Sequence, residues 1–220
     1  MDILAEGVAD LAEAVGPAPD DLIAEMDARA DREGFPTVGP AVGGWLALLA
    51  RTVDARRVFE FGSGFGYSAY WFARELPAEG EVVLTEVDRG ELEDAREYFE
   101  RAGLSDRARF EHGDAIDTVE HYDGPFDVVL IDNEKHRYVE AFEAVRGTVR
   151  EGGLVLADNA VTAGPIDHRD VLALLRGEEV DASDASHGIA DYITHVRSAE
   201  GFETALLPLG EGVAVSVKRG

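Results

Sequence analysis

The sequence contains no cysteine, so disulfide bonds and thiolate metal sites are excluded. Lysine is almost as scarce: Lys135 and Lys218 are the only two, and every other basic residue is arginine. No apolar run approaches the roughly 18 to 20 residues that a membrane-spanning helix needs. The opening residues, MDILAEGVADLAEAVG, carry acidic but no basic side chains, unlike a signal or transit peptide. We therefore expect a cytoplasmic protein with no membrane partner.

Basic residues are also scarce relative to acidic ones. The chain has 45 acidic and 20 basic residues, which gives a formal net charge of −25. Such a surface repels polyanions, so nucleic acid is excluded as an expected partner. An acidic excess with few lysines is typical of a protein adapted to high salt, where counterions screen the repulsion. We expect a halophilic protein, and the alternative is an acidic mesophilic one.

The length of 220 residues favours one domain over residues 1–220. Residues 1–35 predict an N-terminal helical extension with two helices. A Gly- and Pro-rich break at 16–19 separates the two helices, and a second such break at 34–36 ends the extension.

Beyond the extension, apolar runs alternate with amphipathic segments, which indicates an α/β fold with a doubly wound, mostly parallel sheet. The expected strands are 57–61, 81–86, 108–112, 126–132 and 154–158. The expected helices are 66–76, 89–102, a short one after 114, and 138–150. In the tail, 202–207 and 213–218 predict a hairpin, so an antiparallel pair should close the sheet. Residues 160–190 give the weakest pattern.

Two of the buried strands end in oxygen ligands. The run FDVVLID ends at Asp132, and GGLVLADN ends at Asp158 and Asn159. In open α/β sheets ligands bind beyond the carboxyl ends of the strands, so these three side chains should converge. Hard oxygen donors suit Mg²⁺ or another divalent cation. The alternative role of the two aspartates is helix N-capping.

Lys135 follows Asp132 by three residues. In a chain that otherwise avoids lysine, its position beside a carboxylate cluster points to a catalytic role. Lysine is also the basic side chain whose pKa shifts readily enough to act as a base. The alternative is a solvated ammonium on the surface.

A glycine-rich loop, GSGFGYS at residues 62–68, follows the first expected strand. Such a strand-to-helix loop lets the backbone approach a ligand closely. A dinucleotide fingerprint would need a third glycine where Tyr67 stands, so a nicotinamide cofactor is excluded by spacing. Without other signals, an ordinary tight turn is the alternative.

Acidic residues accompany this loop: Glu60 and Glu86 end the first two strands, and Asp114 follows the third. A carboxylate in that position accepts hydrogen bonds from ribose hydroxyls. Carboxylates without a basic phosphate clamp suit a ligand with a ribose, an amine and a positive charge. S-adenosylmethionine has all three.

From about Phe35 onwards the chain resembles the class I S-adenosylmethionine-dependent O-methyltransferases of the catechol and caffeoyl-coenzyme A type. The shared pieces are TVGPAVGG, RRVFEFGSGFGYSAYWFA, VVLTEVD, HGDA, FDVVLIDNEKHRY, GGLVLADN and LLPLGEGVAVSVKR. The resemblance implies a Rossmann-like seven-stranded sheet with an antiparallel C-terminal strand. Family analogy also favours a homodimer.

The resemblance implies roles for individual residues. Those implied for the cofactor are Val38, Gly62 and Ser68 at its methionine part, Glu86 at its ribose and Gly113, Asp114 and Ala115 at its adenine edge, with Glu60 and Asp132 beside them. Those implied for the metal are Asp132, Asp158 and Asn159, with Lys135 near the attacking hydroxyl. Two features depart from the family: the residues between Asp132 and Lys135 differ, and no aromatic follows Asn159 to stack on a substrate.

The expected reaction is methyl transfer from S-adenosylmethionine to a hydroxyl of a small catechol-like or phenolic acceptor. A chelated divalent cation would lower the pKa of that hydroxyl and fix its angle. Lys135 would accept the proton or stabilise the oxyanion. The alternatives are a metal-independent class I methyltransferase acting on another small molecule, and a non-catalytic S-adenosylmethionine-binding protein.

Overall fold

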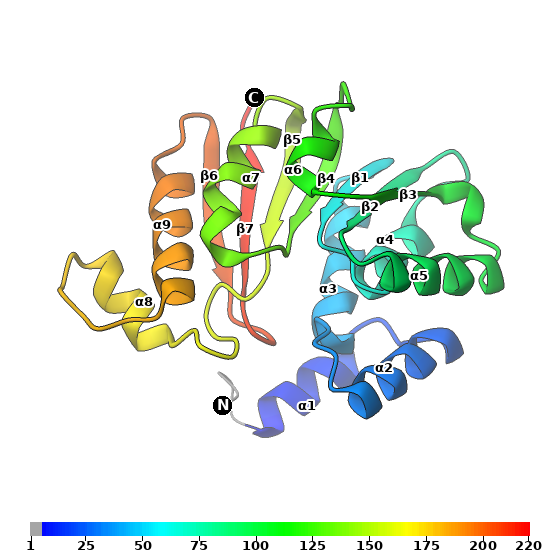
Figure 1. Ribbon diagram of the computed structural model, residues 1–220, viewed down its shortest axis with the longest axis horizontal. Coiled ribbons are helices and arrows are strands. Elements are labelled where there is room, and N and C mark those ends of the chain that lie inside the picture. Colours follow the sequence, from blue (N-terminus) through cyan, green and yellow to red (C-terminus); the bar gives the residue numbers. More distant parts are fainter. Residues whose placement is uncertain (1–5) are drawn as a thin grey trace.

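The computed structural model describes residues 6–220, in which seven strands form one sheet with helices on both faces (Figure 1). The strands are β1 (Arg57–Phe61), β2 (Glu81–Glu86), β3 (Ala108–His112), β4 (Phe126–Ile131), β5 (Val149–Ala157), β6 (Phe202–Leu207) and β7 (Val213–Lys218). Their order is β3-β2-β1-β4-β5-β7-β6. The first five run parallel, and β7 pairs antiparallel with both β5 and β6. The predicted sheet with its antiparallel C-terminal strand is confirmed.

The helices of residues 6–220 divide between the two faces. They are α1 (Glu6–Val15), α2 (Asp21–Glu33), α3 (Gly39–Thr52), α4 (Tyr67–Glu75), α5 (Arg89–Arg101), α6 (Ala115–Val119), α7 (Tyr138–Val145), α8 (His168–Leu175) and α9 (Asp184–Ser198), with short 3-10 turns η1 (Ser105–Arg107) and η2 (Lys135–Arg137). Helices α3, α4 and α5 cover one face, and α6, α7 and α9 cover the other. None of these described helices combines the length and apolar character needed to cross a membrane.

Alternating side chains on each central strand join the sheet to both layers. On β4, Val128 and Leu130 pack into the core beneath α3 and α4, whereas Val129 and Ile131 pack beneath α7 and α9. All four are fully buried. Successive strand residues point to opposite faces, so a continuous apolar run is what a sheet covered on both sides requires.

Both ends of helix α2 have clear signals in the sequence. The Asp20 carboxylate caps α2 by accepting hydrogen bonds from the backbone N–H groups of Leu22 and Ile23, at 3.1 and 2.9 Å. Gly34 ends α2 in a left-handed conformation, with φ of 64°. The predicted pair of helices is therefore present, although residues 1–5 of the expected extension lie outside the described residues.

Two predicted boundaries are wrong, and three helices, α3, α8 and α9, were not expected. The helix expected over 138–150 ends at Val145, and β5 begins at Val149 instead of residue 154. Val149 pairs with Phe126, and the register between β4 and β5 then shifts before Val128 pairs with Leu154. Strand β5 therefore begins before this irregularity, outside the apolar run that starts at Leu154. Helix α3 was not expected, because its start is rich in Gly and Pro. Helix α9 was not expected either, because its first turn is polar.

Candidate active site

The strand register brings the two predicted aspartates together. Ile131 of β4 pairs with Ala157 of β5, so Asp132 and Asp158 follow paired positions at one edge of the sheet. The Asp158 backbone N–H donates to the Ile131 carbonyl oxygen at 3.1 Å, and the Asp132 N–H donates to Phe61 at 2.9 Å. The convergence predicted from the sequence is thus a consequence of parallel pairing.

The glycine loop lies directly against Asp132. Gly62 has φ of 80°, and a Cβ atom at this position would lie 2.6 Å from the Asp132 carbonyl oxygen. No other residue fits that space without moving backbone. Gly62 therefore places the candidate cofactor loop in contact with the end of β4.

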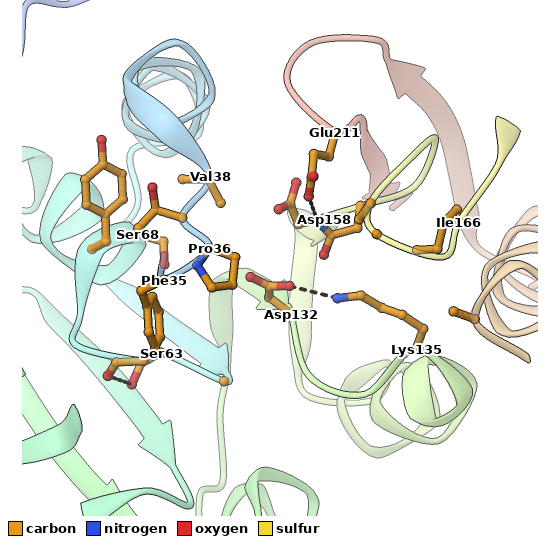
Figure 2. Close-up of a pocket in the computed structure, with 18 of the residues that line it drawn as sticks. Phe35, Pro36, Val38, Ser63, Ser68, Asp132, Lys135, Asp158, Ile166 and Glu211 are labelled. Carbon is orange, nitrogen blue, oxygen red and sulfur yellow. Dashed lines mark hydrogen bonds and ion pairs between the residues drawn. The ribbon is translucent and has the colours of Figure 1, made fainter. Parts of the chain in front are cut away.

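These segments enclose a cavity of about 490 Å³ (Figure 2). The polar side chains that line it are Thr37, Ser63, Tyr67, Ser68, Glu86, Asp132, Lys135, Asp158, Asn159 and Glu211. The N-terminal segment 35–38 forms one wall, and the apolar residues Ala163, Pro165, Ile166 and Ala185 form another. Val38, a predicted cofactor residue, is the N-cap of α3 and faces this cavity. An adjoining cavity of about 320 Å³ shares Gly62, Glu86 and Asp132 and reaches the segment 113–115.

Asp158 and Asn159 have the properties expected of metal ligands. The Asp158 side chain is buried, and its Oδ1 atom has no hydrogen-bond partner within the described part of the chain. Burial, together with the charge of Asp132, raises the pKa of the Asp158 carboxyl well above its usual value. A bound cation would satisfy the lone oxygen and offset that cost. The donors present therefore fit a divalent cation.

Asn159 completes the donor set. It adopts a left-handed backbone conformation, with φ of 55°, which asparagine tolerates better than most residues. Within residues 6–220, no three His, Asp or Glu side chains are grouped as a metal centre. A cation bound here would therefore need the Asn159 amide oxygen as its third protein ligand.

Lys135 is held at the same edge. Its Nζ atom donates to Asp132 Oδ1 at 3.0 Å, to the Asn133 carbonyl oxygen at 3.2 Å and to the Tyr138 hydroxyl at 2.7 Å. The fully buried Tyr138 hydroxyl in turn donates to the Asp158 carbonyl oxygen at 3.2 Å. Burial raises the pKa of Asp132, and the Lys135 charge opposes that shift. Lys135 is thus a partly buried ammonium facing the cavity, not a solvated surface group.

Glu86 is fixed by backbone donors. Its Oε2 atom accepts from Gly64 N–H at 2.8 Å, and its Oε1 atom accepts from Val87 and Asp88 N–H at 2.8 and 2.9 Å. Each carboxylate oxygen has two lone pairs, so Oε1 is fully engaged and Oε2 can accept one further donor. Glu86 is therefore an oriented acceptor between the two cavities, where the ribose was predicted.

Glu60 lies behind the cavity wall. It is fully buried, does not line the cavity, and accepts a hydrogen bond from the Ser68 hydroxyl. Burial raises the pKa of Glu60 to about 8. Ser68 lines the cavity, so Glu60 could act on a cofactor through Ser68. Direct contact between Glu60 and the cofactor stays a prediction.

Asp114 has its carboxylate engaged already. It caps α6 by accepting from Ile116 N–H at 2.8 Å, and it pairs with the Arg137 guanidinium. The hydrogen bond from Arg137 lowers the pKa of Asp114. Gly113, Asp114 and Ala115 line the smaller cavity, and their contact with an adenine edge stays a prediction.

Sequence reasoning missed Tyr138 and Glu211. Tyr138 was hidden in an amphipathic helix pattern, although its spacing of three from Lys135 could have indicated contact. Glu211 lies in the turn between β6 and β7. Because β7 runs antiparallel to β5, the residues before β7 return to the carboxyl edge of the parallel strands, and that topology could have revealed Glu211.

Comparisons with known proteins identify related sequences and structures. A family model described as O-methyltransferase matches residues 23–219. A catechol O-methyltransferase from Niastella koreensis is 35% identical over 162 residues, covering 71% of this chain and 73% of the relative. A caffeoyl-CoA O-methyltransferase from Petroselinum crispum is 25% identical over 185 residues, covering 79% and 73%. The O-methyltransferase from Bacillus cereus, solved in complex with SAH, has a TM-score of 0.82 at 25% identity, with 97% of each chain covered.

Proposed function

Because this chain belongs to the O-methyltransferase family, whose model spans residues 23–219, we propose that it is a divalent-metal-dependent enzyme that methylates one hydroxyl of a small catechol-like acceptor. The resemblance seen in the sequence is confirmed: the chain is an S-adenosylmethionine-dependent O-methyltransferase. The metal and the acceptor are the proposed parts.

The observation that carries the proposal is the unpartnered, buried Oδ1 atom of Asp158. It lies at the edge that also presents Asp132 and Asn159, and leaving such an atom unsatisfied is costly. Asp132, Asp158 and Asn159 would hold the cation. When bound, the cation would supply Lewis-acid chemistry, lowering the pKa of a hydroxyl and orienting it.

The glycine loop and its neighbours would hold S-adenosylmethionine. The first turn of α3 after Val38 supplies backbone N–H groups and the positive end of the helix dipole for the methionine carboxylate. Glu86 would accept the ribose hydroxyls. These contacts would place the sulfonium in the larger cavity, where the carboxylates favour its positive charge.

Lys135 would face the reacting hydroxyl. Its ammonium would stabilise the developing oxyanion, or its amine would accept the proton, and both roles require its present position beside Asp132. Tyr138 would hold that position through its hydroxyl. Proximity of the oxygen to the methyl group would supply much of the remaining rate enhancement.

The cavity walls favour a small acceptor without phosphates. Among the described residues that line the larger cavity, Lys135 is the single basic side chain, and it is paired with Asp132. A coenzyme A thioester would meet no free cation there, and the net charge of −25 would repel it. The apolar wall at Pro165, Ile166 and Ala185 suits an aromatic ring.

The proposal is tested with labelled S-adenosylmethionine, catechol and phenol, with Mg²⁺ or with excess EDTA. We expect catechol to be methylated far faster than phenol, because a vicinal diol would offer two oxygens to the cation and a phenol only one. EDTA should abolish turnover while S-adenosylmethionine affinity, measured by calorimetry, persists. Asp158→Ala should behave like EDTA, and Glu93→Ala, an exposed acidic residue on α5, should behave like the wild type. Full activity in EDTA would favour a metal-independent methyltransferase, and no turnover of catechol or phenol would overturn the proposed acceptor class.

A further inference from the structure

Glu211 makes a specific contact with the proposed ligand Asn159. The Asn159 side-chain amide donates a hydrogen bond to Glu211 Oε2 (Figure 2). Glu211 is exposed to solvent, and it lines the same cavity as Asp132 and Asp158. The contact joins the turn before β7 to a proposed metal ligand at the end of β5, so it bears on the proposed cation site.

The backbone around Glu211 is locked to the segment that follows Asn159. The Glu211 carbonyl oxygen accepts from Val161 and Thr162 N–H, both at 3.0 Å, and the Gly212 carbonyl oxygen accepts from Ala160 N–H at 2.8 Å. Gly212 has φ of 88°, and a Cβ atom there would lie 2.3 Å from Val161 Cγ2. The turn therefore cannot shift independently of Asn159.

The chemistry of this contact sets the orientation of the amide. An ionised carboxylate only accepts hydrogen bonds, so Asn159 must turn its NH₂ group towards Glu211. The amide oxygen is then left for the cavity, which is the orientation that a cation requires. We propose that Glu211 is a positioning residue that fixes the Asn159 amide for metal binding. This inference rests on the metal-dependent function proposed above.

A simpler role for Glu211 would be its negative charge alone. The two roles predict opposite results for Asn159→Asp. If only charge mattered, an added carboxylate would tighten cation binding. If Glu211 acts as an acceptor, the carboxylate introduced by Asn159→Asp would have no hydrogen to donate and would face another carboxylate, so cation binding would weaken.

The experiment measures Mn²⁺ affinity by the electron paramagnetic resonance signal of free Mn²⁺, at pH 8 without acceptor, in the full-length protein. Outer partners of ligands typically change metal affinity by about 10- to 100-fold, and we expect Glu211→Ala and Asn159→Asp each to lose about that much. Glu211→Gln keeps an acceptor for Asn159 and should lose far less. In Asn159→Asp with Glu211→Gln, the new amide can donate to the new carboxylate, so affinity should recover.

Two controls separate this inference from the proposed function. S-adenosylmethionine affinity should stay unchanged in all four variants, which shows that the site is folded, and Glu93→Ala should keep wild-type Mn²⁺ affinity. Equal losses in Glu211→Ala and Glu211→Gln, or tighter binding by Asn159→Asp, would overturn the positioning role while leaving the proposed function intact. A wild-type protein that binds no Mn²⁺ would overturn the metal dependence itself.

Discussion

Lys135 and Asp132 form an ion pair at the end of β4, with Nζ and Oδ1 3.0 Å apart. The pair places a fixed positive charge next to a carboxylate that also faces the proposed cation. In the proposed mechanism, Lys135 would repel the cation slightly while it stabilised a negative oxygen. Its contribution should appear in turnover and not in metal affinity.

Replacing Lys135 with alanine should lower kcat by about 10² to 10⁴, the range for a positioned acid–base group. Affinity for S-adenosylmethionine should be nearly unchanged, and Mn²⁺ affinity should stay level or rise. Steady-state kinetics and calorimetry measure these quantities. The chain offers a matched control in its other lysine: Lys218 binds the Arg146 and Val149 carbonyl oxygens far from the site, and Lys218→Ala should keep kcat. Near wild-type kcat in Lys135→Ala would remove Lys135 from the mechanism.

Replacing Glu86 with alanine should weaken S-adenosylmethionine binding by about 1 to 3 kcal/mol, the cost of losing a charge-assisted acceptor. The loss should have two sources. The ribose would lose its acceptor. The glycine loop would lose the 2.8 Å hydrogen bond from the Gly64 N–H to the Glu86 carboxylate. Calorimetric titration of the purified protein measures the change.

Glu86→Gln separates the two sources, because an amide keeps one acceptor oxygen and the shape of the side chain. Its loss of affinity should be smaller than that of Glu86→Ala. Equal affinity in wild type and Glu86→Ala would show that Glu86 does not touch the cofactor.

Much of the sheet was predictable from the local sequence pattern. The first three strands begin and end at the predicted residues. Strands β1 and β2 were predictable because each is a short, mainly apolar run. The aspartates were predictable for a related reason: in a parallel sheet every strand delivers its last residue to the same edge. Paired positions 131 and 157 then guarantee that Asp132 and Asp158 meet.

Other features depend on distant packing and were not predictable from local pattern. Helix α3 contains Gly43, whose absent Cβ makes room for Trp71: a Cβ would lie 2.2 Å from the indole nitrogen. A glycine that opposes helix formation locally is thus required by a tertiary contact. Glu211 reaches the site only because β7 is antiparallel, and Glu60 is buried because β1 lies between β2 and β4 in a sheet covered on both faces.

Raising the salt concentration should stabilise the protein. With a net charge of −25, self-repulsion acts over the Debye length, which falls from about 30 Å at 0.01 M to about 3 Å at 1 M. The thermal midpoint should therefore rise between low and molar KCl. A series in sorbitol of equal osmolality controls for effects that do not involve charge. A midpoint that stays level in KCl, or that rises equally in sorbitol, would contradict the halophilic interpretation.

Glu60 should make the stability of the ligand-free protein depend on pH. Burial raises its pKa from the ordinary 4.5 to about 8, so the folded state holds a proton that the unfolded state has lost over most of that interval. Stability falls with pH wherever the folded state binds more protons, at most on the order of 1.4 kcal/mol for each pH unit from a single group. The contribution of Glu60 is therefore complete below about pH 4.5 and is lost as pH rises to about 8.

Glu60→Gln mimics the protonated carboxyl and should remove this part of the slope. Urea titrations measure the free energy of unfolding of each protein. The two values should be closest near pH 5, and the stability of the variant relative to the wild type should then increase up to pH 8. Other buried acids such as Asp158 titrate in the same direction, so the difference between the two proteins is the quantity to follow. Glu93→Gln, at an exposed position, should leave the slope unchanged. Parallel pH profiles for wild type and Glu60→Gln would show that Glu60 is ionised in the folded protein despite its burial.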